Sequence, residues 1–207
     1  MLATDTIFLI VVIIFSAIIH EVMHGVAADK LGDPTARYAG RLTLNPIPHI
    51  DLFGSIILPV LLALSGSPLF FAWAKPVPYN PYNLKPGRWS EAIVAGAGPA
   101  SNLVIALIAG FLIQSGIAAP IAGTLFLVVV VNVMLCIFNL IPVPPLDGSK
   151  VLEAFLPRPL AHGYANWRAS MERNQLLGMG VVLIIILLFG GAFGAFIYTV
   201  AQAIAGL

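Results

Sequence analysis

The chain has 207 residues, of which 59% are hydrophobic and 9% are charged, and its formal net charge is +1 at pH 7. Soluble domains carry roughly 25% charged residues, and the mean hydropathy here is +0.99. The composition therefore excludes an ordinary soluble domain and indicates an integral protein of a lipid bilayer. The small net charge gives no general attraction to nucleic acid, and one cysteine excludes an intramolecular disulfide.

Four segments are long and apolar enough to cross a bilayer, which takes about 20 residues. They cover residues 6–27, 91–116, 121–141 and 176–203. We therefore predict an all-α polytopic membrane protein with about four transmembrane helices, in a single domain that covers residues 1–207.

The first apolar segment ends in an ionisable motif, His20-Glu21-Val22-Met23-His24, which has the form H-E-x-x-H. Residues four apart share one face of a helix, so His20 and His24 can present two imidazoles to one metal ion. Glu21 lies beside them, where a carboxylate can act on a metal-bound water. Three ionisable residues in an apolar span are costly without a partner, so we interpret the motif as a functional site rather than as a packed histidine pair.

The polar connection after this segment contains an alternating stretch, Gly40–Asn45, which is followed by Pro46. Alternation of this kind predicts a short β-stretch near the motif. Peptide bonds are hidden in a helix, so a helical substrate must become extended before it is hydrolysed. We hypothesise that Leu42, Thr43 and Leu44 pair with the extended substrate by strand addition.

Two further segments differ from plain spans. Residues 52–74 are apolar but are interrupted by Pro59 and by Ser65-Gly66-Ser67-Pro68, which favours a turn. Residues 157–174 are polar and contain Tyr164 and Trp167, which is typical of a helix that lies on the membrane surface.

A catalytic zinc ion usually has three protein ligands and one open position, so the motif needs one more ligand. Asp147 is the strongest candidate, because it follows three prolines at the end of an apolar span. Those prolines unwind the backbone, and unwound backbone at membrane depth needs a polar surrounding such as a metal site. His49 and Asp51 are an alternative or auxiliary pair, for which we favour structural hydrogen bonds in a loop.

Three motifs, taken in order, resemble the site-2 protease family of intramembrane zinc metalloproteases. They are His-Glu-Val-Met-His at 20–24, Ala-Gly-Pro-Ala-Ser-Asn at 97–102, and Asn-Leu-Ile-Pro at 139–142 with Pro-Leu-Asp-Gly at 145–148. Gly-Arg-Leu-Thr-Leu-Asn-Pro at 40–46 and Trp-Ala-Lys-Pro-Val-Pro at 73–78 are similar to compact bacterial and archaeal members. The resemblance covers most of residues 20–150.

The resemblance implies one Zn²⁺ per chain, held by His20, His24 and Asp147, with Glu21 as the general base. It also implies that Asn102 lies near the active site, where it either helps to position the substrate backbone or only bridges helices. The implied reaction is hydrolysis of a peptide bond within or near a transmembrane segment of a single-pass membrane protein, such as an anti-sigma factor or a signal-peptide remnant. The PDZ and nucleotide-sensing domains of larger relatives are not expected in this length.

A shared zinc ion also constrains the topology. The first span and the span that precedes Asp147 must end on the same face, and the span 91–116 must begin there. Residues 52–74 therefore cannot cross once, and we expect them to re-enter the face from which they came. All ten Lys and Arg residues then lie on one side, which the positive-inside rule assigns to the cytoplasm. We expect a prokaryotic inner membrane, with the active site toward the cytoplasmic side.

Two other functions fit some of these features. A membrane transporter or ion-binding protein can also use intramembrane His, Glu and Asp, but the sequence shows no symmetry-related broken helices and this function leaves Glu21 without a role. A catalytically silent homologue that only binds membrane proteins is the other alternative, although every residue of the motifs is present.

Overall fold

The computed structural model describes residues 3–57, 60–61, 64–65 and 73–207. Its elements in chain order are α1 (Ala3–Lys30), α2 (Thr35–Tyr38), the short turns η1 (Ile47–His49), η2 (Leu52–Ile57) and η3 (Pro81–Asn83), α4 (Ser90–Gln114), η4 (Ala119–Ile121), α5 (Ala122–Asn139), α6 (Asp147–Phe155), α7 (Arg158–Arg173) and α8 (Gln175–Ala205). Among the described residues the protein is thus built from helices and their connections.

Four helices are long and apolar enough to cross a membrane, as the sequence predicts. Their apolar parts run over Ile7–Lys30, Ser90–Gln114, Ala119–Asn139 and Leu177–Ala205. The prediction of an all-α polytopic membrane protein is confirmed. The polar stretch that was expected to lie on the membrane surface also forms one helix, α7, which buries none of its residues.

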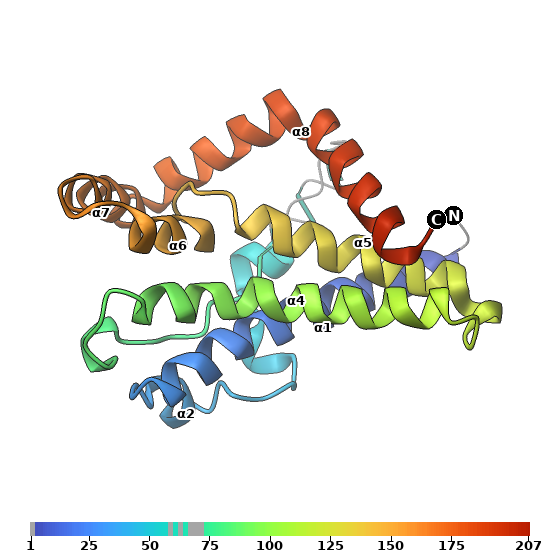
Figure 1. Ribbon diagram of the computed structural model, residues 1–207, viewed down its shortest axis with the longest axis horizontal. Coiled ribbons are helices and arrows are strands. Elements are labelled where there is room, and N and C mark those ends of the chain that lie inside the picture. Colours follow the sequence, from blue (N-terminus) through green and yellow to red (C-terminus); the bar gives the residue numbers. More distant parts are fainter. Residues whose placement is uncertain (1–2, 58–59, 62–63, 66–72) are drawn as a thin grey trace.

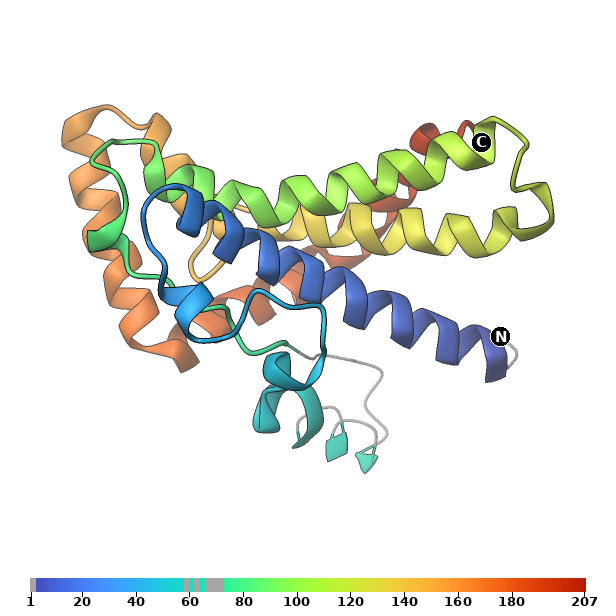
Figure 2. The ribbon, with the colours of Figure 1, turned by 90° about the horizontal axis from the view of Figure 1, so that it is seen from below.

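Helices α1, α4 and α5 run side by side and form the centre of the molecule (Figures 1 and 2). The core between α4, α5 and α8 combines small residues with branched ones: Ala106, Ala109, Val129, Val133, Ile197 and Ala201. Small side chains allow helix backbones to approach closely, which is the main source of packing energy between helices in a bilayer. Gly110 shows how close the approach is, because a Cβ there would lie 2.4 Å from the carbonyl oxygen of Ile204.

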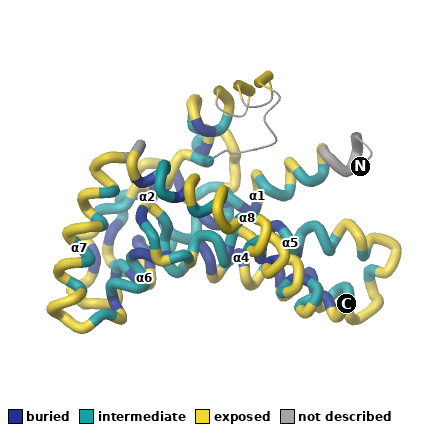
Figure 3. Tube along the Cα trace, turned by 90° about the horizontal axis from the view of Figure 1, so that it is seen from above, coloured by how far each residue is buried: buried dark blue, intermediate teal, exposed yellow. Residues whose placement is uncertain are grey.

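Helix α8 packs less tightly than the other three. It leaves the α7 end of the molecule, rises away from α5 and returns to it near its C-terminal end (Figure 1). Its buried side chains follow this course: Val182 lies near its start, while Ile197, Ala201 and Ala205 lie near its end. Figure 3 shows the same contrast, with long exposed stretches on α7 and α8 and buried residues where α1, α4 and α5 meet.

The polar connections gather at one end of the helix bundle. In Figures 1 and 2 helices α2, α6 and α7 lie at this end, where α1 and α5 finish and α4 begins. The start of α1, the C-terminus and the turn between α4 and α5 lie at the opposite end. The spans that carry the histidine motif and lead to Asp147 therefore end on the same face, as a shared metal ion requires.

The prediction of a β-stretch at Gly40–Asn45 is wrong, since no strand occurs among the described residues. Local hydrogen bonds hold this stretch in bends instead. Thr43 Oγ1 accepts the backbone N–H of Asn45 at 3.1 Å, and the Asn45 side chain accepts that of Ile47 at 3.1 Å. Side chains of this type compete with ladder hydrogen bonds, and the carbonyl of Thr43 is engaged by His49 Nε2 at 2.9 Å. The hypothesis of strand addition at Leu42, Thr43 and Leu44 loses its structural basis.

The two ends of the predicted re-entrant segment lie against each other. The backbone N–H of Trp73 donates to the carbonyl of Gly54 at 3.2 Å, and Ser55 Oγ donates to the carbonyl of Trp73 at 2.8 Å. A segment that enters and leaves through one face needs this contact. The turn predicted at residues 65–68 falls mostly outside the described residues, so the re-entrant course itself stays a prediction.

Candidate metal centre

Three side chains from two distant parts of the chain converge where α1 meets the start of α6. His20 and His24 lie one turn apart on α1, and Asp147 is the first residue of α6. Asp147 Oδ2 lies 3.1 Å from His20 Nε2 and 3.3 Å from His24 Nε2. One possible ligand atom from each residue lies within 4.8 Å of the other two. The structure therefore brings together the three ligands that the sequence predicts.

Asp147 reaches the histidines because α6 begins directly against the end of α5. The chain leaves α5 at Asn139, passes through the proline-rich turn and starts α6 after only seven intervening residues. Gly148 permits this close return, since a Cβ there would lie 2.2 Å from the carbonyl oxygen of Leu140. In the Asp-Gly pair, Asp147 therefore supplies the carboxylate, and Gly148 allows the backbone to pass close to Leu140.

Each imidazole is fixed from behind through its Nδ1 atom. His20 Nδ1 donates to Asn102 Oδ1 at 2.6 Å, and His24 Nδ1 donates to the carbonyl oxygen of Val94 at 2.7 Å. Because both Nδ1 atoms carry the proton, each neutral ring has its lone pair on Nε2, the atom that faces Asp147. Hydrogen bonds of this kind set the tautomer and the orientation of metal-binding histidines.

Asn102 belongs to a buried polar network that joins three spans. Its Nδ2 donates to Asn132 Oδ1 of α5 at 2.9 Å and to the carbonyl of Ser16 of α1 at 3.3 Å. Asn132 Nδ2 in turn donates to Ser16 Oγ at 3.0 Å. Asn102 and Asn132 are both fully buried. Asn102 therefore lies behind His20, where it both bridges helices and orients a ring.

The donor set and the space around it fit a zinc ion. Two Nε2 lone pairs and one carboxylate oxygen point at one another, an arrangement that favours a cation among them, and N/O ligands of this kind suit zinc. Space is kept open by Gly98 of α4, where a Cβ would lie 2.5 Å from His24 Nε2 and 2.7 Å from His20 Nε2. Any larger residue at this position would fill the region in front of the imidazoles.

The electrostatics of the centre favour an ionised Asp147. Burial acts to raise the pKa of this carboxyl, but when the two imidazoles are protonated their hydrogen bonds and positive charge outweigh burial and hold the pKa well below its usual range. A cation bound at the Nε2 lone pairs would replace these protons and lower the pKa in the same way. The side chain is 16% exposed. Asp147 is therefore an anion at neutral pH, the state that a metal ligand needs.

Glu21 is held beside the centre but outside the ligand cluster. Its Oε2 accepts the backbone N–H of Val77 at 2.8 Å. Val77 belongs to the extended connection before α4, so this connection, and not α1 alone, sets the direction of the carboxylate. One oxygen of Glu21 is thereby engaged, and the other has no hydrogen-bond partner among the described residues.

A cavity of about 360 Å³ opens beside His20 and Glu21. Its other walls come from Ile13 and Ala17 of α1, from the connection at Trp73 and Pro76, from the end of α5 and from α8. Most of these side chains are apolar. The cavity is therefore suited to an apolar peptide segment that lies next to ionisable groups.

The other residues singled out from the sequence lie away from the metal ligands. His49 donates to the carbonyl of Thr43, and Asp51 Oδ1 accepts the backbone N–H of Gly54 at 2.7 Å. Both thus make the structural loop bonds that were favoured for them. Leu42 packs toward Gly25 of α1, where a Cβ would come within 2.6 Å of it, while Leu44 is exposed.

Sequence reasoning missed four contributors: the Asn132 and Ser16 side chains, the space at Gly98 and the backbone N–H of Val77. A signal existed for Asn132, because an amide side chain inside an apolar span rarely stands without a partner. No signal existed for Val77, since a backbone donor leaves no trace in residue identity.

Comparison with known proteins gives an assignment consistent with this geometry. The sequence profile of peptidase family M50 matches residues 112–187. The chain is 36% identical to YwhC of Bacillus subtilis, a protein named as a proposed zinc metalloprotease, over 86% of this chain and 79% of that protein. It is 33% identical to the Rip2 proteins of Mycolicibacterium smegmatis and Mycobacterium tuberculosis, which bear the same description, over 69% and 68% of this chain and 55% and 54% of theirs. No solved structure matches the chain.

The relationship to YwhC covers 86% of this chain and 79% of that protein, and the largely buried cluster of His20, His24 and Asp147 could hold the metal ion of such an enzyme. These observations decide against a transporter. The chain is a membrane zinc metalloprotease that belongs to peptidase family M50, the site-2 proteases.

Proposed function

We propose that the protein hydrolyses a peptide bond within or near a transmembrane segment of another membrane protein. The observation that supports this proposal most is the position of the metal ligands and the adjoining cavity. His20 and His24 lie inside the span Ile7–Lys30, and the cavity beside them has walls from three spans and is mainly apolar. A soluble peptide would not favour such surroundings, whereas an unwound transmembrane segment would.

The residues of the chain divide the chemistry between them. His20, His24 and Asp147 would hold the zinc ion, which when bound polarises the scissile carbonyl and lowers the pKa of water. Glu21 takes a proton from the attacking water and passes it to the leaving amine, which is general base and then general acid catalysis. The Val77 N–H holds one carboxylate oxygen of Glu21, so the other is oriented for this transfer.

We infer further that the active site lies toward the cytoplasm of a prokaryotic inner membrane. The metal centre lies near the end of the bundle at which α2, α6 and α7 gather. All Lys and Arg residues lie in or beside the connections at this end, which supports a cytoplasmic location by the positive-inside rule. Single-pass proteins such as anti-sigma factors or signal-peptide remnants are the proposed substrates.

The proposal is tested with purified protein in detergent and a panel of single-pass membrane proteins as substrates. We expect cleavage within the membrane segment of at least one of them, loss of cleavage with a zinc chelator, and recovery after zinc is restored. The E21Q variant, checked for zinc content, is the control for contaminating proteases. Cleavage confined to soluble loops would contradict the proposal, even if it depended on zinc.

A further inference from the structure

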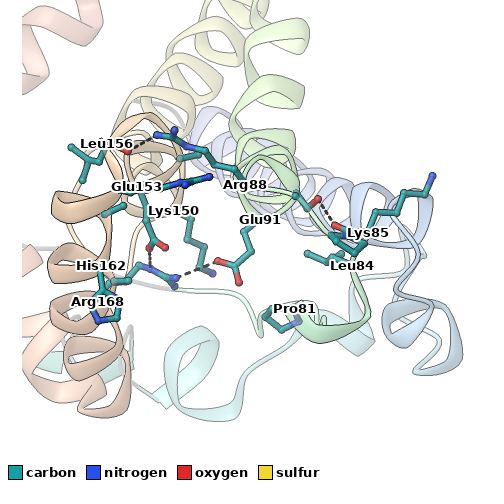
Figure 4. A pocket seen from close by; sticks show the side chains of 17 residues that line it. Pro81, Leu84, Lys85, Arg88, Glu91, Lys150, Glu153, Leu156, His162 and Arg168 are labelled. Carbon is teal, nitrogen blue, oxygen red and sulfur yellow. Dashed lines mark hydrogen bonds and ion pairs between the residues drawn. The ribbon is translucent and has the colours of Figure 1, made fainter.

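A second cavity, of about 660 Å³, lies at the polar end of the bundle (Figure 4). Its walls come from the connection before α4, from the first turn of α4, and from α6 and α7. It shares no lining residue with the cavity beside His20 and Glu21. The proteolytic reaction proposed above gives it no role.

The two carboxylates that line this cavity are neutralised within the protein. Arg168 of α7 pairs with Glu91 of α4 at 3.2 Å and with Glu153 of α6 at 2.8 Å. Figure 4 shows the Arg168 guanidinium between these two carboxylates. The same guanidinium also pairs with Glu172, which lies one turn further along α7.

Three other cations of the cavity remain without an acidic partner. Within the described part of the chain, Arg88, Lys150 and Arg158 form no ion pair with a carboxylate, although all three line the cavity. Arg88 donates to the carbonyl of Leu156. Lys85 lines the cavity too, but Figure 4 shows its side chain directed away from the space.

Lys150 is the most informative of these cations because it is largely enclosed. Its amino group lies 5.2 Å from the centre of the Tyr79 ring. Burial acts to lower the pKa of Lys150, but its electrostatic interaction and hydrogen bond with Tyr79, and the more distant charges of Glu172 and Asp147, outweigh burial, so the pKa lies above its usual value. The ammonium is therefore charged at neutral pH, and no carboxylate forms an ion pair with it among the described residues. An enclosed cation without such a pair favours an anionic ligand.

Exposed apolar and aromatic side chains stand next in the sequence to several residues that line the cavity. Trp89 and Phe155 stack edge to face with their ring centres 5.0 Å apart, and they are 47% and 66% exposed. Leu160 and Trp167 of α7 are exposed as well. Exposed Trp side chains mark the level of lipid headgroups, and a basic cavity between helices at that level is the kind of site that binds anionic lipid.

We propose that this cavity binds a phosphate-bearing anion through Arg88, Lys150 and Arg158. The chemistry is shared by free phosphate and by the glycerophosphate headgroup of an anionic phospholipid. The exposed side chains of Trp89 and Phe155, which adjoin lining residues in the sequence, favour the lipid, because its acyl chains could cover them.

The test measures thermal unfolding of the purified full-length chain in a neutral detergent. The probes are short-chain phosphatidylglycerol, short-chain phosphatidylcholine, glycerol 3-phosphate and inorganic phosphate. We expect phosphatidylglycerol to raise the unfolding temperature in a saturable way and phosphatidylcholine to leave it unchanged. An equal rise with inorganic phosphate at the same concentration would identify the free anion as the source.

Two matched pairs of variants separate the cavity from the general surface charge. R158Q is compared with R173Q on the same helix, and K150Q is compared with K85Q, whose side chain is directed away. R158Q and K150Q should each weaken the apparent affinity about fivefold, because one Lys or Arg near an anionic headgroup contributes on the order of 1 kcal/mol. The two controls should bind as the wild type does.

Equal weakening in the controls, or no rise with either phosphatidylglycerol or phosphate, would overturn the proposal. Zinc content is measured for every variant, because Lys150 lies one turn from Asp147. R88Q replaces K150Q if the latter does not fold. None of these measurements depends on proteolysis, so the outcome is independent of the proposed function.

Discussion

The two imidazoles of the metal centre are held by different kinds of acceptor. His24 donates to a backbone carbonyl, whereas His20 donates to the side chain of Asn102. A carbonyl inside a helix survives any substitution of its residue, but an amide side chain does not. Mutation can therefore disturb the orientation of His20 far more easily than that of His24.

N102A should consequently weaken zinc binding while leaving the helices intact. Loss of a partner behind a metal-binding histidine typically costs 10- to 100-fold in metal affinity, and we expect about that loss here. Zinc affinity is measured by competition with a chromophoric chelator. T199V is the matched control, because Thr199 also carries a polar group inside a span but bonds only within its own helix. Equal zinc affinity in N102A and wild type would contradict the positioning role of Asn102.

Variants at Glu21 and at Asp147 should distinguish loss of catalysis from loss of metal binding. E21Q should retain one zinc ion and lose about 100-fold or more in cleavage rate, because it removes a general base. D147A and H24A should each lose zinc itself, since each removes one of three protein ligands. Metal analysis of the purified variants decides between the two classes. A folded E21Q protein without zinc would show that Glu21 is itself a ligand.

Gly98 offers a test of the space in front of the ligands. G98A places a methyl group 2.5 Å from His24 Nε2 and 2.7 Å from His20 Nε2, so we expect loss of zinc with little change in helix content. G191A is the control, because nothing lies within 4 Å of a Cβ at that position. Both variants are compared by metal analysis and circular dichroism. Normal zinc content in G98A would mean that the ligands hold the ion elsewhere.

Much of this site could be read from the sequence, for physical reasons. Spacing of i and i+4 on a helix fixes the side on which His20 and His24 stand, and the prolines before Asp147 indicate where the backbone turns back. Contacts such as Asn132 with Ser16, which are 116 residues apart, depend on how the helices pack and have no local pattern.

At the level of elements, the connection between α1 and α4 is organised by one buried carboxylate. Asp33 is fully buried. Its oxygens accept from the Thr35 hydroxyl at 2.5 Å, from the Asn80 backbone N–H at 2.6 Å and from Asn83 Nδ2 at 2.9 Å. It thus ties the end of α1 to the same connection that presents the Val77 N–H to Glu21. Asp33 and Glu21, the proposed general base, are thus linked through one stretch of backbone.

D33N should lower stability at neutral pH, and its deficit relative to the wild type should shrink in acid. Burial acts to raise the pKa of Asp33, but hydrogen bonds from Thr35, Asn83 and Asn80 outweigh it and lower the pKa below its ordinary value of 3.8. Folding therefore favours the ionised form. This stability is complete above pH 3.8 and is lost as the pH falls through the lower folded pKa.

The expected difference at pH 7 is about 2 kcal/mol, because hydrogen bonds to a charged group contribute about 1.5–3 kcal/mol. Thermal unfolding of metal-free wild type and D33N is compared at pH 7 and pH 3, so that zinc release does not enter. A gap between the two proteins that stays constant over this range would refute the ionised role of Asp33.

The elements themselves were predictable where burial in lipid decides the structure. A long apolar segment in a bilayer forms a helix, because its backbone N–H and C=O groups must hydrogen-bond within the segment. Gly40–Asn45 lies in a polar connection, where lipid does not force the backbone groups to bond within the segment. Hydrogen bonds to the Thr43 and Asn45 side chains therefore form bends there instead of the strand that the alternating pattern predicts. Patterns thus predict structure less well in the polar connections than in the spans.

For the whole molecule, the positions of the helix ends predict which segments face the cytoplasm and which face the outside. Position 170 lies on α7 at the polar end, and position 115 follows α4 at the other. In a Cys136→Ser background, a membrane-impermeant thiol reagent added from outside should label Cys placed at Ser115 and not at Ser170. Permeabilised cells should show labelling at Ser170 as a control. Strong outside labelling at Ser170 would invert the proposed orientation.

The turn between α4 and α5 has a consequence for biogenesis. Residues 114–122 carry no charged side chain, and α4 and α5 pack against each other through the core described above. Translocation of this turn therefore requires no cation to cross the bilayer, and the two helices can enter the membrane together as a hairpin. Arginines placed at Ser115 and Ala118 would oppose this passage, so the failure would occur at insertion, before any metal is bound.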